Sequence, residues 1–433
     1  MSSLEQWLAY QTKLHPQAID LGLDRLRQVL RALDWRQPDI PVITVAGTNG
    51  KGSVSAYCAS ILKAAGYRVG SFTSPHLRDY RERIQIHDRL VSAAELVAAF
   101  ERIEAARGAV GLTFFEFNAL AAFLVFEAAR LDAWVLEIGM GGRLDAVNVV
   151  DADVAVVVSI GLDHQEYLGT TLEAIAREKG GIFRRGRAAV LGSSDLPGVL
   201  ETMARELGAP LKRPGIEFRY ALDGQSFEFH GARWNLTNLP APALIGAAQY
   251  ANAATAIAAL EELDARLPVP AAAVARGLRD VQLTARFEVI APRDRQPTWI
   301  LDVAHNPAAA RVLAQNLRAL PSAGRTLAVC GILADKDAAG VAAALRDSID
   351  AWWCIDTDGE RGRSGKSLAR TVALEVAAPV SAVDSVAAGC AAALGQASPL
   401  DRIVVFGSFH VVGPALDWLE AHDYTAAPRA TLV

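Results

Sequence analysis

A glycine-rich turn that contains a lysine and a serine follows the first apolar run of the chain. Residues 47–53 read Gly-Thr-Asn-Gly-Lys-Gly-Ser and come directly after the β-branched run 42–46. Glycines let successive backbone N–H groups point at one anion, and the start of a following helix adds partial positive charge. The turn therefore predicts a nucleotide-phosphate site, with contacts from Thr48, Asn49, Gly50, Lys51, Gly52 and Ser53.

The roles within this turn follow from side-chain chemistry. Lys51 can reach the terminal phosphates of a nucleotide, and Ser53 can place its hydroxyl on Mg²⁺. The turn departs from the usual P-loop because Gly52 separates Lys51 from Ser53 and the loop ahead of the lysine is short. An ordinary strand–turn–helix junction is the alternative, and phosphate binding alone does not define a reaction.

Three more polar side chains follow apolar strands, where ligands bind in open α/β sheets. Glu137 ends a buried run, so its carboxylate needs either a salt-bridge partner or a hard cation such as Mg²⁺. His164 lies just past the run 154–160 and is either a hydrogen-bonded core histidine or a metal ligand. Ser74 precedes a proline and taken alone indicates a turn.

The elements that position these residues alternate along the chain. At 433 residues the chain is too long to fold around a single hydrophobic core, so two domains are expected. Apolar runs without polar alternation predict a first domain at residues 1–290, built on a doubly wound, mostly parallel sheet. A small β patch at 216–234 belongs to the same domain. A polar, proline-flanked linker at 291–297 leads into a second, Rossmann-like α/β domain at 298–433. The strands expected in the first sheet are 42–46, 68–72, 134–138, 154–160 and 188–191.

Composition excludes several classes of protein. Net charge is −5 and the isoelectric point about 6.0, so no electrostatic case for nucleic acid exists. The 4 cysteines are scattered without metal-ligand spacing, which favours reduced thiols and a cytoplasmic protein. No apolar run reaches the roughly 20 residues needed to span a bilayer, and residues 1–16 lack the apolar core of a signal peptide.

Six segments in order resemble one enzyme family. The turn at 47–53 is similar to that of the ATP-dependent Mur ligase superfamily. With the segments below, the chain resembles the bacterial folylpolyglutamate synthases that also act as dihydrofolate synthases, from residue 19 to residue 410. The further segments are 72–77 (Phe-Thr-Ser-Pro-His-Leu), 136–146 (Leu-Glu-Ile-Gly-Met-Gly-Gly-Arg-Leu-Asp-Ala), 161–164 (Gly-Leu-Asp-His), 177–182 (Arg-Glu-Lys-Gly-Gly-Ile) and 301–307 (Leu-Asp-Val-Ala-His-Asn-Pro).

The resemblance implies ATP and Mg²⁺ as cofactors, with two metal sites and room for a monovalent cation such as K⁺. It makes Ser74, Glu137 and His164 metal ligands, and it makes Lys179 a carbamylated ligand near the second metal. Lys51, Lys179 and His164 would be catalytic. The remaining ATP contacts would be Asn252, Arg286, Asp302 and His305; a surface cation is the alternative for Arg286, and Ala248 stands where the family often has histidine.

The same resemblance places the pterin of the substrate. Phe115 could stack on a flat heterocycle, although core packing is the alternative for Phe114 and Phe115. Asp145 could accept hydrogen bonds from ring N–H groups. The expected pterin contacts are Asp20, Leu21, Gly22, Leu23, Thr113, Phe114, Phe115, Glu116, Leu144, Asp145 and Ala146.

The implied activity is joining L-glutamate to dihydropteroate and to folate monoglutamates through an acyl phosphate. A monomer that binds only small molecules is expected, with its two domains closing about the linker to exclude water. A Mur-type ligase acting on a cell-wall nucleotide is an alternative. Against it, the P-loop begins near residue 47, which leaves no room for an extra N-terminal UDP-binding domain. A P-loop nucleotide switch is the second alternative, which Glu137 alone does not exclude.

Overall fold

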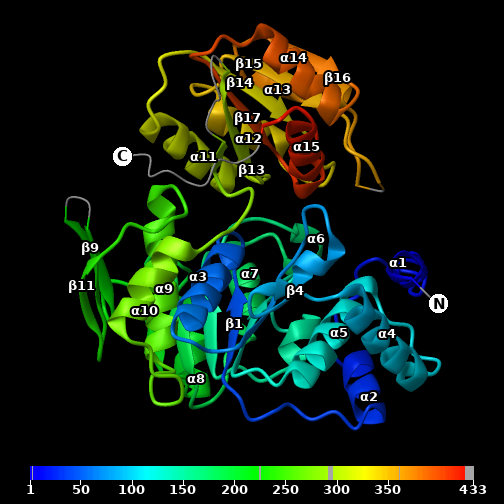
Figure 1. Cartoon of the computed structure of the whole chain (residues 1–433), viewed down its shortest axis with the longest axis vertical. Helices are drawn as coiled ribbons and strands as arrows, with labels where there is room; N and C mark the ends of the chain where they lie inside the picture. The colour runs from blue at the N-terminus through cyan, green and yellow to red at the C-terminus, as the bar shows by residue number, and fades with distance from the viewer. Residues whose placement is uncertain (2, 224–225, 291–295, 360, 425–433) are drawn as a thin grey trace. The chain divides into compact units, whose positions relative to one another are not determined.

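The computed structural model describes the chain except residues 2, 224–225, 291–295, 360 and 425–433. The described chain forms two compact units (Figure 1). The first comprises Met1–Ala243 and Tyr250–Val281, and the second comprises Leu244–Gln249 and Gln282–Val433. Most of the expected linker, 291–295, lies outside the described residues. The boundary between the two units lies earlier in the sequence than this linker. Strand β12 (Glu288–Ile290) already pairs with β13 (Thr298–Asp302) in the second unit.

The first unit is built on an eight-stranded sheet in the order β4-β3-β2-β5-β1-β6-β7-β8. The strands from β2 to β8 in this order run parallel, and β3 turns back against β2 at the edge. Helices on both faces explain why β1, β5 and β6 read as unbroken apolar runs. The strands are β1 (Val42–Ala46), β2 (Val69–Phe72), β3 (Ile84–Ile86), β4 (Arg89–Leu90), β5 (Ala133–Glu137), β6 (Val154–Val157), β7 (Ala188–Leu191) and β8 (Leu211–Lys212).

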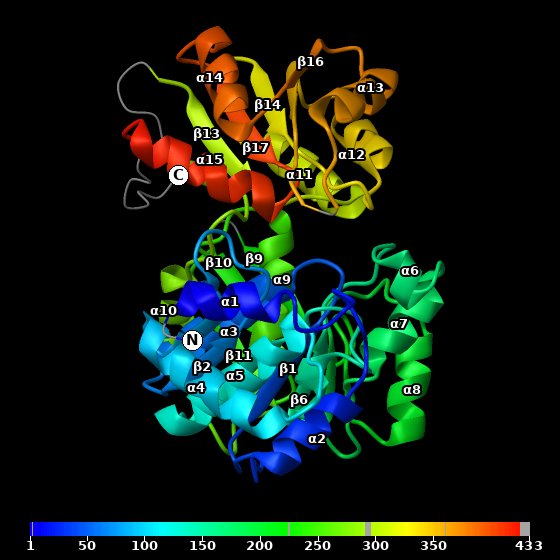
Figure 2. The same ribbon diagram turned by 90° about the vertical axis from the view of Figure 1, so that its right-hand side faces the viewer.

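Helices and a small antiparallel sheet complete this unit. The capping boxes Ser92/Glu95 and Thr113/Glu116 begin α4 and α5. Helices α6, α7 and α8 follow one another along one side (Figure 2). The elements are α1 (Leu4–Gln11), α2 (Asp24–Ala32), α3 (Lys51–Ala64), α4 (Ala93–Arg107), α5 (Phe114–Ala129), α6 (Gln165–Leu168), α7 (Leu172–Gly180), α8 (Val199–Leu207), α9 (Ala247–Glu261), α10 (Ala271–Asp280), β9 (Arg219–Asp223), β10 (Ser226–His230) and β11 (Asn235–Leu239).

Helix α10 supports α3, the helix that begins at the phosphate turn (Figure 1). A Cβ on Gly277 would lie 2.5 Å from Cα of Ile61, so only glycine permits this approach. The hydroxyl of Ser60 donates to the carbonyl of Gly277 at 2.8 Å. Residues more than 200 positions apart in the sequence therefore hold α3 in place.

We expect Gly277→Ala to lower the free energy of unfolding by about 1–3 kcal/mol, because the added methyl would force the two helices apart. Denaturant unfolding measures this loss. Gly395→Ala in α14 (Val386–Gln396) is the matched control, since a Cβ there meets nothing within 4 Å. That variant should gain the usual helix preference for alanine. Wild-type stability in Gly277→Ala would show that the helices tolerate separation.

The second unit has a six-stranded sheet in the order β12-β13-β17-β14-β15-β16. All neighbouring pairs are parallel except β12 with β13. Helices α11, α12 and α13 lie on one face, and α14 and α15 lie on the other (Figure 2). The other elements are β14 (Thr326–Cys330), β15 (Ala351–Ile355), β16 (Val380–Val383), β17 (Arg402–Phe406), α11 (Pro307–Ala319), α12 (Ala338–Leu345), α13 (Gly365–Glu375) and α15 (Phe409–Ala421).

The α/β class, with one large sheet in each unit and a small β sheet in the first, is confirmed, with local corrections. The alanine-rich run 382–394 alone predicts a helix, but its first residues are a strand, because β16 extends to Val383 and Ser385 then caps α14. The strand predicted at 154–160 ends at Val157, because the following residues bond to the phosphate turn. Within the described residues, no helix is long and apolar enough to cross a membrane.

Candidate active site

The phosphate turn follows β1 and is fixed to the loop after β6. The N–H of Thr48 donates to the carbonyl of Ser159 at 2.8 Å, and the N–H of Asn49 donates to its hydroxyl at 2.9 Å. The Thr48 hydroxyl also bonds to both the N–H and the carbonyl of Gly161. These groups hold the turn in shape. The amides of Thr48 and Asn49 are therefore used in internal hydrogen bonds.

The amides that can face a phosphate are those that begin α3. Gly50 caps this helix with φ 82°, and a Cβ there would lie 2.8 Å from Val158 and 3.0 Å from Oδ1 of Asn252. The N–H groups of Lys51, Gly52 and Ser53 lie in the first turn of α3, where no intrahelical carbonyl is available. Asn252, from α9, thus lies against the turn.

Two lysines converge on one carbonyl oxygen of the turn. Nζ of Lys51 donates to the carbonyl of Gly47 at 3.0 Å, and Nζ of Lys179 donates to the same oxygen at 3.1 Å. Lys179 ends α7 and is only 4% exposed. Burial, together with the nearby charge of Lys51, lowers the pKa of Lys179 to about 7. A neutral amine at this position is therefore available near neutral pH.

The predicted metal ligands Ser74 and Glu137 lie side by side. Glu137 ends β5 and is 5% exposed, and its Oε2 accepts the N–H of Ser74 at 3.3 Å. Behind them lies Arg83, a buried guanidinium whose Nε bonds to Nδ1 of His76 at 2.8 Å. Burial lowers the pKa of Arg83, while the charge of Glu137 opposes this effect. Arg83 could not be singled out from its neighbours in the sequence, because its burial depends on folding of the 74–83 segment.

His164 begins α6 with φ 50°, and its side chain remains partly exposed. Its Nε2 lies 4.0 Å from Oδ1 of Asp163, a residue that sequence analysis did not single out. Within the described residues, no group of three or more His, Cys, Asp or Glu side chains could form a closed metal cage. Mg²⁺ prefers oxygen ligands and usually takes one or two carboxylates together with phosphates. Ser74 and Glu137 fit that pattern.

An arginine joins two of the three expected pterin segments. Nε of Arg25 donates to Oε1 of Glu116 at 3.0 Å, and its Nη1 donates to Oδ2 of Asp20 at 2.6 Å. Glu116 also closes the capping box with Thr113, and burial raises the pKa of its carboxyl group. The side chains of Asp20 and Glu116 therefore order the segments, and Leu21, Gly22 and Phe114 remain partly exposed beside them.

The third pterin segment carries a buried carboxylate. Oδ2 of Asp145 accepts the N–H of Met140 at 2.8 Å, and Oδ1 accepts the N–H of Val147 at 3.0 Å. Burial raises the pKa of Asp145 to about 7, although these hydrogen bonds and Lys51 oppose the rise. Phe115 packs on the backbone of Gly139, where a Cβ would lie 2.4 Å from the ring. Asp145 therefore shapes the loop that also contains Leu144 and Ala146.

The predicted residues Arg286, Asp302 and His305 belong to the second unit. Asp302 ends β13, and its two oxygens accept the N–H groups of Phe287 (2.8 Å) and Ala304 (2.7 Å). Burial raises the pKa of Asp302, while the charges of Arg286 and His305 oppose this rise. Arg286 also lies over the ring of Phe409 at 5.3 Å. The three residues thus form one charged group at the carboxyl end of β13.

The sequence matches two family models. Residues 45–260 match the Mur ligase middle domain, and residues 285–409 match the Mur ligase glutamate ligase domain. The dihydrofolate synthase/folylpolyglutamate synthase of Escherichia coli (strain K12) is 43% identical over 97% of this chain and 96% of that protein. The Haemophilus influenzae protein of the same name is 38% identical over 95% of this chain and 96% of that protein.

Solved structures give the same result. Escherichia coli FolC in complex with DHPP and ADP has a TM-score of 0.91 and 42% identity, covering 97% of this chain and 98% of that chain. A bifunctional folylpolyglutamate synthase/dihydrofolate synthase with Mn, AMPPNP and L-glutamate bound has a TM-score of 0.89 and 42% identity over the same shares. With the phosphate turn, the paired lysines and the Ser74–Glu137 pair in place, the chain belongs to the dihydrofolate synthase/folylpolyglutamate synthase family of Mur ligases.

Proposed function

We propose that this protein joins L-glutamate to dihydropteroate and to folate monoglutamates, using ATP and Mg²⁺. The observation that carries the proposal is the meeting of Lys51 and Lys179 at the carbonyl of Gly47, in a chain closely related to enzymes of that name. Relatives bound to ADP, AMPPNP, Mn and L-glutamate support the nucleotide, a divalent metal and the amino acid.

In the first step, a carboxylate oxygen of the pteroate or folate attacks the γ-phosphorus of ATP. The bond from that phosphorus to the β-γ bridging oxygen breaks, which gives an acyl phosphate and ADP. Lys51 and the amides at the start of α3 hold the phosphate oxygens, where negative charge develops. To do this, Lys51 exchanges its present bonds to the carbonyls of Gly47 and Thr48 for bonds to phosphate.

In the second step, the amino nitrogen of L-glutamate attacks the acyl carbon. The carbon–oxygen bond to phosphate breaks, inorganic phosphate leaves, and the nitrogen loses a proton as the amide forms. Ser74, Glu137 and His164 would hold Mg²⁺, and a carbamylated Lys179 would provide a ligand near a second metal. The bound metal supplies positive charge for the phosphate oxygens. Asn252, Arg286, Asp302 and His305 would complete the nucleotide site.

ADP release measured against a panel of pteroates, folates and cell-wall nucleotide precursors tests this proposal. We expect ATP turnover only when L-glutamate and a pteroate or folate are both present. Turnover with a cell-wall precursor would instead identify a Mur-type cell-wall ligase. ATP turnover in the absence of L-glutamate and of any pteroate or folate would identify a nucleotide switch, because a switch transfers the phosphate of its nucleotide to water.

We expect Phe115→Ala to lower kcat/KM for dihydropteroate by about tenfold and for a reduced folate by less. The folate is one glutamate longer, so its pterin cannot occupy the same place while its carboxylate reaches the same phosphate. Phe115→Tyr keeps the ring on Gly139 and should restore dihydropteroate use. Equal losses on both substrates would contradict two pterin positions. Asp145→Ala is less informative, since it also removes the bonds to Met140 and Val147.

A further inference from the structure

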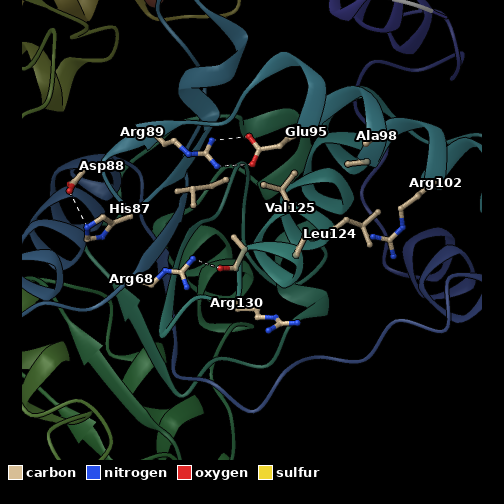
Figure 3. A pocket seen from close by; sticks show the side chains of 14 residues that line it. Arg68, His87, Asp88, Arg89, Glu95, Ala98, Arg102, Leu124, Val125 and Arg130 are labelled. Atoms are coloured by element: carbon tan, nitrogen blue, oxygen red, sulfur yellow. Dashed lines mark hydrogen bonds and ion pairs between the residues drawn. The ribbon is translucent and has the colours of Figure 1, made fainter.

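The first unit has a hollow of about 800 Å³ beside the β3–β4 hairpin and helices α4 and α5 (Figure 3). Ala98 and Ala99 from α4 and Leu124 and Val125 from α5 give it an apolar lining. Arg68, directly ahead of β2, also lines it, so the hollow lies at the amino end of that strand. The phosphate turn follows the carboxyl end of β1, which is parallel to β2 in the same sheet, so the two sites are separate.

The hollow carries excess positive charge in a chain whose net charge is −5. The acidic side chains that line it already have cationic partners. Glu95 accepts two hydrogen bonds from Arg89, at 2.7 and 2.8 Å, and Asp88 lies 3.0 Å from Nε2 of His87 and 3.6 Å from Nζ of Lys63. The remaining arginines that line the hollow are Arg68, Arg102 and Arg130.

These three guanidinium groups are weakly satisfied. Arg68 donates to the carbonyl of Ala129 at 2.6 Å, and Arg102 lies 3.8 Å from Glu127. Among the residues that the structure describes, Arg130 has no acidic partner within ion-pair distance, and neither does Arg68. Fork-shaped guanidinium groups with free donors are suited to carboxylate or phosphate.

Two residues of the hollow have strained backbones. Arg130, the C-cap of α5, has φ 49°, and His87, in the β3–β4 turn, has φ 54°. Glycine or asparagine is favoured at both kinds of position, because a bulky side chain is disfavoured in the left-handed region. Nδ1 of His87 is also buried, with no hydrogen-bond partner among the described residues. A strained backbone at a residue other than glycine suggests the hypothesis that the side chain of that residue has a function.

We propose that this hollow binds a small organic anion with two or more negative charges on a flat body. Arg68 and Arg130 would hold the acidic groups, and Arg102 would add a third positive charge. The flat body would lie on Ala98, Leu124 and Val125, where the small alanine side chain leaves room for a ring. Two kinds of compound share this chemistry: an aromatic acid with a glutamate tail, and a mononucleotide.

Methyl NMR of the full-length protein separates this site from the phosphate turn. Methyl groups of Leu124 and Val125 report on the hollow, and those of Val158 report on the turn, since Val158 lies against Gly50. Pteroyltriglutamate and AMP are the two probes, and the neutral ring benzamide is the reference. We expect at least one acidic probe to shift the Leu124 and Val125 signals saturably, and benzamide to leave them unchanged. The probe that binds identifies carboxylate or phosphate as the recognised group.

Arg130→Gly is the decisive variant, because it removes the guanidinium and also relieves the strained backbone. We expect it to weaken probe binding at least tenfold while the melting temperature stays equal or rises. Arg102→Gln should weaken binding without changing the backbone, and Arg318→Ala, an exposed arginine of α11, should bind as wild type. The proposal is overturned if neither acidic probe shifts Leu124 and Val125 at millimolar concentration, or if Arg130→Gly binds as tightly as wild type.

Discussion

Replacing Lys51 by alanine should lower kcat/KM for glutamate ligation by about 10²–10³-fold with either pterin substrate. The lysine stands at the start of α3, where its ammonium can reach the oxygens of the transferred phosphate. Because Lys51 also bonds to the carbonyls of Gly47 and Thr48, the variant loses about 1 kcal/mol of stability at most. The expected protein is therefore folded and inactive.

Single-turnover formation of the acyl phosphate, followed beside thermal melting, separates these two effects. Lys63→Ala is the matched control, since Lys63 lies in the last turn of the same helix and forms an ion pair with Asp88 at 3.6 Å, away from the phosphate turn. The control should ligate at the wild-type rate. Near-normal acyl-phosphate formation in Lys51→Ala would contradict the proposal that the turn binds phosphate. Loss of activity in both variants would indicate that any substitution in α3 destabilises this helix.

The sequence could predict which polar side chains lie close together, because parallel strands end at one edge of the sheet. Glu137 ends β5 and Ser74 follows the neighbouring strand β2, and the structure places them in contact. Helix α5 was predictable because Thr113 and Glu116 form a capping box ahead of an apolar run. Local signals of this kind need only the residues on either side.

The sequence could not predict contacts that depend on distant segments. Ser159 accepts hydrogen bonds from the amides of Thr48 and Asn49, although Asn49 and Ser159 lie 110 positions apart in the sequence. Arg25 joins Asp20 to Glu116 across 91 residues, and nothing around Arg25 distinguishes it from a surface arginine. Strand β16 was missed because its alternation is weak and the alanine-rich helix α14 follows it at once. Tertiary packing decides each of these cases.

Lys179 should be carbamylated in the folded enzyme, and the paired lysines provide the physical reason. The ammonium groups of Lys51 and Lys179 both bond to the carbonyl of Gly47, so their positive charges repel each other. Attack of the neutral Lys179 amine on CO₂ forms a carbamate and releases a proton, which replaces this repulsion by attraction to Lys51. Burial lowers the pKa of Lys179 to about 7, so the reactive neutral amine predominates above that pH. Carbamate occupancy should therefore fall as the pH decreases through about 7.

Labelled bicarbonate and ¹³C NMR detect this group directly, as a carbamate signal in wild type that is missing from Lys179→Ala. The variant should lose about 10²-fold or more in ligation, because it removes an anionic ligand near the transferred phosphate. Added acetate should restore part of the loss, since a short carboxylate fits the space left by the side chain. Two results would contradict the prediction: no carbamate signal at saturating bicarbonate above pH 8, or full ligation by Lys179→Ala without any added carboxylate. Rescue by acetate but not by methylamine would show that the site requires negative charge at this position, which an unmodified lysine cannot supply.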